Sequence, residues 1–167
     1  MLANKRVWKE ADHRQDYTGM GTTIVAALAD QDVISFVSAG DSRAYRLRNG
    51  ALTQITKDQT MAQAMVDAGA LTQAAAEQSR LKHVLWSALG GKEAAPEVTT
   101  LDCEWEDVML LCSDGLTKHV SDERIAERTG GYFSAMGVEA ISDGEGSRPV
   151  PTATWLKRMA PNAAATI

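Results

Sequence analysis

The sequence predicts an α+β fold in which antiparallel sheets carry helices on their outer sides. Three pairs of apolar stretches, in residues 22–39, 44–56 and 97–113, are each joined by a short polar turn and indicate β-hairpins. Segments with helical spacing precede, interrupt and follow these pairs, which favours antiparallel sheets with separate helices over repeated βαβ units. The 167 residues are enough for one domain with its own core.

The first element expected is a helix from Met1 to Asp16. Ala3, Val7 and Ala11 recur at the helical spacing i, i+4, i+8, and Trp8 widens their apolar stripe. Strands are expected next at residues 22–28 and 33–39, with residues 29–32 as their polar turn.

The clearest hairpin signal is Asn49-Gly50, between apolar stretches at residues 44–48 and 51–56. A type I′ turn requires positive φ at both central residues, which Asn and Gly tolerate best. We therefore expect strands 44–48 and 51–56 to pair across a two-residue turn.

Two short helices are expected between the hairpins. The first has Met61, Met65 and Val66 on one side and ends at Gly69, and the second begins at the N-cap Thr72. Two strands follow, at residues 97–105 and 107–113. Ser121 then caps a helix whose first turn is acidic, which suits the helix dipole.

The residues from Thr129 onward differ from the rest of the chain in composition and periodicity. They contain five Gly and three Pro without sustained periodicity, and one short helix is expected at Thr154–Met159. We therefore expect a main domain at residues 1–128 and a divergent tail at 129–167 that packs on the same domain.

Composition excludes several classes of protein. The net charge is -5 without a basic block, which argues against nucleic acid as the main partner. No apolar stretch is long enough to span a membrane and no signal peptide is recognisable, so a cytoplasmic location is expected. Cys103 and Cys112 lie in apolar stretches and are expected to be buried thiols.

Two aspartates follow predicted strands directly. Asp41 comes after residues 33–39 and Asp114 after residues 108–112, each beside a glycine. Carboxylates at strand ends can point into one cleft and bind a hard divalent cation. The alternative is that each begins a turn and bonds its own backbone. Either pattern is common when it occurs alone.

The order and spacing of several motifs resemble the metal-dependent PP2C (PPM) Ser/Thr phosphatases of bacteria. These motifs are "GMGTT", "GDSRAY" with its "RNG" hairpin, "CSDGL" and "VSDE", together with the flap-like "TKDQTMAQAMVDAGALTQ". The similarity runs from about Trp8 to Ile125. It implies an α/β-β/α sandwich, phosphoprotein substrates, and paired Mn²⁺ or Mg²⁺ ions that activate water for in-line attack.

The resemblance assigns only a few site residues to this chain. Asp114 corresponds to a ligand of the paired metals and of a third metal, and Asp41 corresponds to the other ligand of that third metal. Lys118 lies where some relatives carry another acid, and its charge would weaken metal binding. Arg43 and Arg46 could attract phosphate; a strand-end salt bridge for Arg43 and a solvated strand face for Arg46 are the alternatives.

Relative to the family pattern, this sequence lacks the first strands and the ligands that they carry, and it contains no Asp-Asn pair. Asp114 and Asp41 are therefore expected to be vestigial ligands, with Mn²⁺ or Mg²⁺ bound weakly or not at all. The tail can be a genuine divergent segment or a frameshift product, because another reading frame can encode a helix that ends in Gly-Asp-Asp.

Three functions remain open. The chain can be an impaired phosphoprotein phosphatase, a non-catalytic partner-binding pseudophosphatase, or a remnant stabilised by self-association, for which a homodimer is expected. The scattered histidines (His13, His83, His119) and the tryptophans (Trp8, Trp86, Trp105, Trp155) are expected to be surface or packing residues.

Overall fold

The computed structural model describes residues 2–30, 32–91, 94–105, 107–132 and 153–157. The chain divides into two compact units. The first contains Met1–Ala26, Val37–Ser42 and Lys57–Val98, and the second contains Ala27–Phe36, Arg43–Thr56 and Thr99–Ile167. Each unit is described by itself below.

The second unit contains a four-stranded antiparallel sheet in the order β4-β3-β6-β7. Its strands are β3 (Arg43–Arg48), β4 (Ala51–Gln54), β6 (Val108–Cys112) and β7 (Ala153–Lys157). Arg48 pairs with Ala51, so Asn49 and Gly50 form a two-residue turn with φ of +50° and +79°. The hairpin predicted from Asn-Gly is therefore confirmed.

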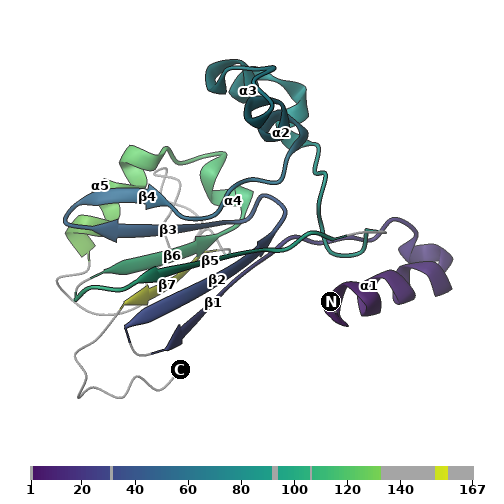
Figure 1. The fold of residues 1–167 in the computed structure, drawn as a ribbon, viewed down its shortest axis with the longest axis horizontal. Helices are drawn as coiled ribbons and strands as arrows, with labels where there is room; N and C mark the ends of the chain where they lie inside the picture. The colour runs from purple at the N-terminus through teal and green to yellow at the C-terminus, as the bar shows by residue number, and fades with distance from the viewer. Residues whose placement is uncertain (1, 31, 92–93, 106, 133–152, 158–167) are drawn as a thin grey trace, which may run out of the picture. The chain divides into compact units, whose positions relative to one another are not determined.

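One face of this sheet carries a hydrophobic cluster of buried side chains. Because side chains alternate along a strand, every second residue of β3 and β6 points to the same face. Figure 1 shows α4 (Asp114–Thr117) and α5 (Asp122–Tyr132) beside this sheet. The buried residues of the cluster are Tyr45, Leu47, Val108, Leu110, Cys112, Leu116, Val120 and Ile125.

A second sheet has three strands in the order β1-β2-β5. These are β1 (Ile24–Asp30), β2 (Val33–Ala39) and β5 (Glu97–Asp102). Strand β1 continues two residues beyond its expected end at Leu28, into the segment predicted as a polar turn. Two sheets with separate helices confirm the predicted α+β class.

The α-helices of the first unit begin and end close to the predicted positions, whereas its 3₁₀ helices were not predicted as such. They are α1 (Leu2–His13), the 3₁₀ helix η1 (Gln15–Tyr17), α2 (Met61–Asp67), α3 (Gln73–Gln78) and the 3₁₀ helix η2 (Arg80–His83). The Thr60 hydroxyl accepts the amide of Gln63 and the Thr72 hydroxyl accepts that of Ala75, both at 3.2 Å. Thr72 is therefore the N-cap that the sequence predicted.

Two local predictions were wrong or incomplete. The segment expected as a helix at Thr154–Met159 contains strand β7, which pairs along its whole length with β6. Pairing with an existing strand supplied backbone hydrogen bonds that local propensity alone does not predict. In addition, α4, the short helix that begins at Asp114, was not predicted from the sequence.

Other expectations are confirmed within the described residues. Cys103 and Cys112 are both buried. Ser121 precedes α5, and its hydroxyl accepts the Arg124 amide at 3.5 Å. In the part of the chain that the structure describes, no helix has the length and apolarity needed to cross a bilayer.

Candidate functional site

Asp114 is the first residue of α4, directly after strand β6 and the connecting Ser113. The Ser113 hydroxyl accepts the Gly115 amide at 3.2 Å and thereby caps this turn. Leu116 fixes the position of α4, because its side chain is fully buried in the hydrophobic cluster on the sheet. A short capped helix therefore holds the Asp114 carboxylate at the end of a buried strand.

Lys118 neutralises this carboxylate from within the same unit. Its Nζ donates to Asp114 Oδ2, four residues earlier on the chain. The Lys118 amide also donates to the Asp114 carbonyl at 2.9 Å, so one helical turn connects the two residues. The two side chains are 46% and 40% exposed, which leaves the pair in contact with water.

Asp41 belongs to the first unit, in the bend that follows β2. The preceding residue, Gly40, has a φ of +107° and exchanges hydrogen bonds with Gln59. The Gln59 amide donates to the Gly40 carbonyl at 2.9 Å, and the Gly40 amide donates to Gln59 Oε1 at 3.1 Å. The buried Gln59 side chain therefore fixes the backbone beside Asp41, a role that the sequence did not indicate.

The surroundings of Gly40 explain why a glycine precedes Asp41. A Cβ atom on Gly40 would lie 2.3 Å from Cγ2 of Thr23. The Thr23 hydroxyl is in turn 2.7 Å from that of Ser42, on the other side of Asp41. Glycine is required here because the backbone approaches the Thr23 side chain closely and φ is positive.

Arg43 is engaged within the second unit by a buried tyrosine. Arg43 Nη1 donates to the Tyr45 hydroxyl at 2.9 Å, and this hydroxyl donates to Asp122 Oδ1 at 3.2 Å. Burial raises the pKa of Tyr45 well above its ordinary value, although Arg43 partly opposes this shift. Tyr45 therefore remains a neutral link between β3 and the start of α5. Phosphate binding by Arg43 stays a prediction.

Arg46 lies on the opposite face of β3 from Tyr45, because adjacent residues of a strand point to opposite faces. Its side chain is half-buried rather than fully solvated, and its Nε is buried without a hydrogen-bond partner among the residues that the structure describes. His13, His83 and His119 are all exposed, which agrees with their expected position at the surface.

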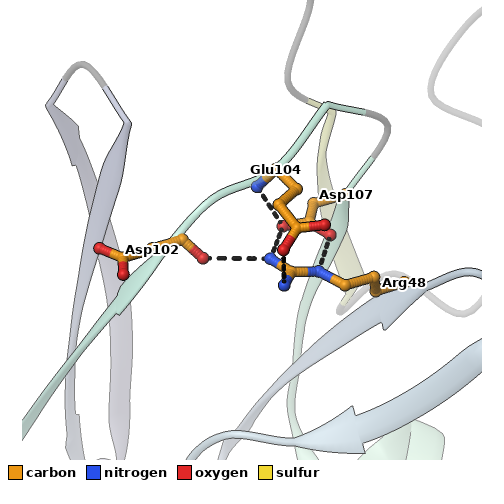
Figure 2. Close-up of polar contacts among 4 residues, drawn as sticks. All are labelled: Arg48, Asp102, Glu104 and Asp107. Atoms are coloured by element: carbon orange, nitrogen blue, oxygen red, sulfur yellow. Dashed lines mark hydrogen bonds and ion pairs between the residues drawn. The ribbon is translucent and has the colours of Figure 1, made fainter.

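The strongest polar cluster of the second unit was not predicted. Figure 2 shows the Arg48 guanidinium between Asp107, Glu104 and the backbone carbonyl of Asp102. Arg48 Nη1 donates to Glu104 Oε1 at 2.6 Å, and Nη2 donates to the Asp102 carbonyl at 3.1 Å. The cluster joins the end of β3 to the turn between β5 and β6, so its role is structural. The acidic residues 102–107 were the available signal.

The described residues do not fit a dinuclear metal centre. Tight sites for hard cations use several oxygen ligands, most of them carboxylates. Within the described ranges, no three or more His, Cys, Asp and Glu side chains come together in a way that could hold a metal ion. The Asp114 carboxylate, the ligand best supported by the motif, already has a cationic partner in Lys118.

Comparison with known proteins agrees with the motifs and the fold. Residues 2–143 match the family model described as protein phosphatase 2C. The chain is 42% identical over 124 residues to the serine/threonine protein phosphatase PstP of Mycobacterium tuberculosis, covering 74% of this chain and 24% of that protein. It is 36% identical to the serine/threonine phosphatase stp of Listeria monocytogenes, covering 74% of this chain and 50% of that protein.

Solved structures show the same similarity. The catalytic domain of PstP in complex with two manganese ions superposes with a TM-score of 0.64 at 42% identity, covering 74% of this chain and 51% of that one. The chain thus spans between 24% and 51% of the length of these relatives.

Proposed function

Because the chain belongs to the protein phosphatase 2C family, we propose that these 167 residues form a phosphoprotein Ser/Thr phosphatase domain that is catalytically impaired. The observation that carries this proposal is the engagement of Asp114 by Lys118. A carboxylate that is already paired with an ammonium group is a poor ligand for a divalent cation. Mn²⁺ or Mg²⁺ would therefore bind weakly or not at all.

The surrounding residues support the same conclusion. Asp41 and Asp114 are the two carboxylates that the family motifs assign to metal, and two such ligands are fewer than a dinuclear site needs. Without the paired ions, these residues offer no group that would activate water in their place. The exposed His119 is close to Asp114 in sequence, and its backbone amide donates to the Leu116 carbonyl at 3.0 Å rather than to that carboxylate.

Hydrolysis of p-nitrophenyl phosphate with and without Mn²⁺ tests the proposal. The catalytic domain of PstP, assayed beside it at equal concentration, is the positive control. We expect a metal-dependent rate several orders of magnitude below that of PstP. A rate within tenfold of PstP would show that these residues complete a working site and would overturn the proposed impairment.

The same engagement of Asp114 favours a second candidate, a non-catalytic domain that binds phosphoproteins. Without the metal ions the domain would not hydrolyse phosphate esters, but its fold would still present a surface that phosphoproteins can bind. Binding of a fluorescent phosphothreonine peptide, compared with its unphosphorylated form, separates the two candidates. Preference for the phosphorylated peptide without turnover would support the binding role, and equal or absent binding would reject it.

A further inference from the structure

The ion pair between Asp114 and Lys118 is positioned by a buried strand and a short helix. Asp114 follows the buried strand β6. Leu116, which lies between Asp114 and Lys118 in the sequence, is buried in the hydrophobic cluster and fixes α4 against the sheet. Residues four apart on a helix lie on the same side, so Lys118 can reach Asp114 without leaving its own helical turn. The helical backbone thus places the ammonium group within hydrogen-bonding reach of this carboxylate.

A divalent cation that approached Asp114 would meet the positive charge of Lys118 at short range. Like charges a few ångströms apart repel, and salt screens interactions at that distance only weakly. The hydrogen bond from Nζ also engages Oδ2, so a cation that left this bond in place would be limited to Oδ1. Lys118 therefore opposes metal binding both by repulsion and by occupying a ligand oxygen.

We propose that Lys118 replaces a divalent cation as the partner of Asp114 and thereby excludes Mn²⁺ and Mg²⁺ from this carboxylate. The inference rests on the proposed function, because both use the contact between Asp114 and Lys118 and both treat Asp114 as the carboxylate that the family motif assigns to metal. It assigns to Lys118 a specific effect, which is to set the metal affinity of this position.

The chain contains a matched control in its first unit. Lys57 Nζ lies 2.6 Å from Asp67 Oδ1, and the two side chains are 53% and 43% exposed. This pair resembles Lys118–Asp114 in chemistry and exposure, but it is not associated with any metal motif. Replacing Lys118 by methionine removes the cationic partner of Asp114. Replacing Lys57 removes that of Asp67, which still accepts a hydrogen bond from Gln63 Nε2 at 3.1 Å.

Paramagnetic broadening of backbone amide signals by Mn²⁺ provides a readout that does not depend on catalysis. The full chain, Lys118→Met, Lys57→Met and the double variant Lys118→Met/Asp114→Asn are titrated with submillimolar Mn²⁺. We expect several-fold greater broadening of residues 113–118 in Lys118→Met than in the unmodified chain. The double variant should lose this increase. Lys118→Gln provides a second variant should Lys118→Met fold poorly.

Two results would overturn the inference. The first is equal broadening of residues 113–118 with and without Lys118. The second is an equally large increase around Asp67 in Lys57→Met, which would mean that any released carboxylate attracts Mn²⁺. Neither result depends on the phosphatase assay, so failure of this inference is distinguishable from failure of the proposed function.

Discussion

The guanidinium of Arg48 donates two parallel hydrogen bonds to the carboxylate of Asp107, from Nε to Oδ1 at 2.7 Å and from Nη2 to Oδ2 at 2.6 Å. Asp107 is only 1% exposed, whereas the Arg48 side chain is 23% exposed. A planar fork that matches a carboxylate is specific to arginine. The pair thereby holds the β5–β6 turn against the end of β3.

The first prediction concerns the asymmetry of this pair. Arg48→Met leaves a buried carboxylate without its partner, whereas Asp107→Asn leaves a guanidinium that water can reach. A buried carboxylate that loses its partner costs roughly 3–5 kcal/mol of unfolding free energy. Urea denaturation at pH 7 should therefore show a larger loss for Arg48→Met than for Asp107→Asn. Equal losses, or the reverse order, would contradict the assigned burial.

The second prediction concerns pH. Burial acts to raise the pKa of Asp107, but hydrogen bonds from Arg48 and from the Glu104 amide outweigh it and hold the pKa below its ordinary value. The stability that this group contributes is complete above the unfolded-state pKa of about 3.9 and is lost as pH falls through the folded-state pKa. The gap in unfolding free energy between the unmodified chain and Asp107→Asn should therefore shrink below about pH 4. A gap that is constant or widens between pH 5 and pH 3 would reject this.

The third prediction uses two glycines with positive φ. Gly40→Ala combines an unfavourable φ with a Cβ that would lie 2.3 Å from the Thr23 side chain. Gly19→Ala shares only the unfavourable φ of +77°, since no atom lies within 4 Å of its Cβ. We expect losses of more than about 2 kcal/mol for Gly40→Ala and about 1 kcal/mol for Gly19→Ala in thermal melts. Similar losses would show that the Thr23 contact is relieved at little cost.

The fourth prediction concerns assembly. We propose that the chain forms a homodimer through the edges of the β1-β2-β5 sheet, whose outer strands expose Leu28 (72%) and Val98 (70%). Unpaired strand edges are templates for pairing with a second chain. Sedimentation at low micromolar concentration should give twice the monomer mass of 18.0 kDa. Replacing Val98 with lysine should shift the species toward monomer, and a monomeric unmodified chain would exclude the dimer.

Local signals predicted much of the fold because they act over a few residues. The Asn49-Gly50 turn and the Thr72 cap are both present, since each depends on the conformation or hydrogen bonds of its immediate neighbours. Strand β7 was missed because its partner, β6, lies about 45 residues earlier in the sequence.

The candidate site was predictable in part. Motifs singled out Asp41 and Asp114, and the family resemblance led to the prediction that the charge of Lys118 would weaken metal binding. The contacts of Gln59 and Arg48 were not predictable, because they join residues that are distant along the chain. Such contacts become visible only once the pairing of the strands is known.

Calorimetric titration of the unmodified chain with Mn²⁺ tests the central claim most directly. We expect no submicromolar site, because Asp114 is engaged by Lys118 and the described residues contain no cluster of three or more potential ligands. Heat that fits two tightly bound Mn²⁺ ions per chain would contradict it.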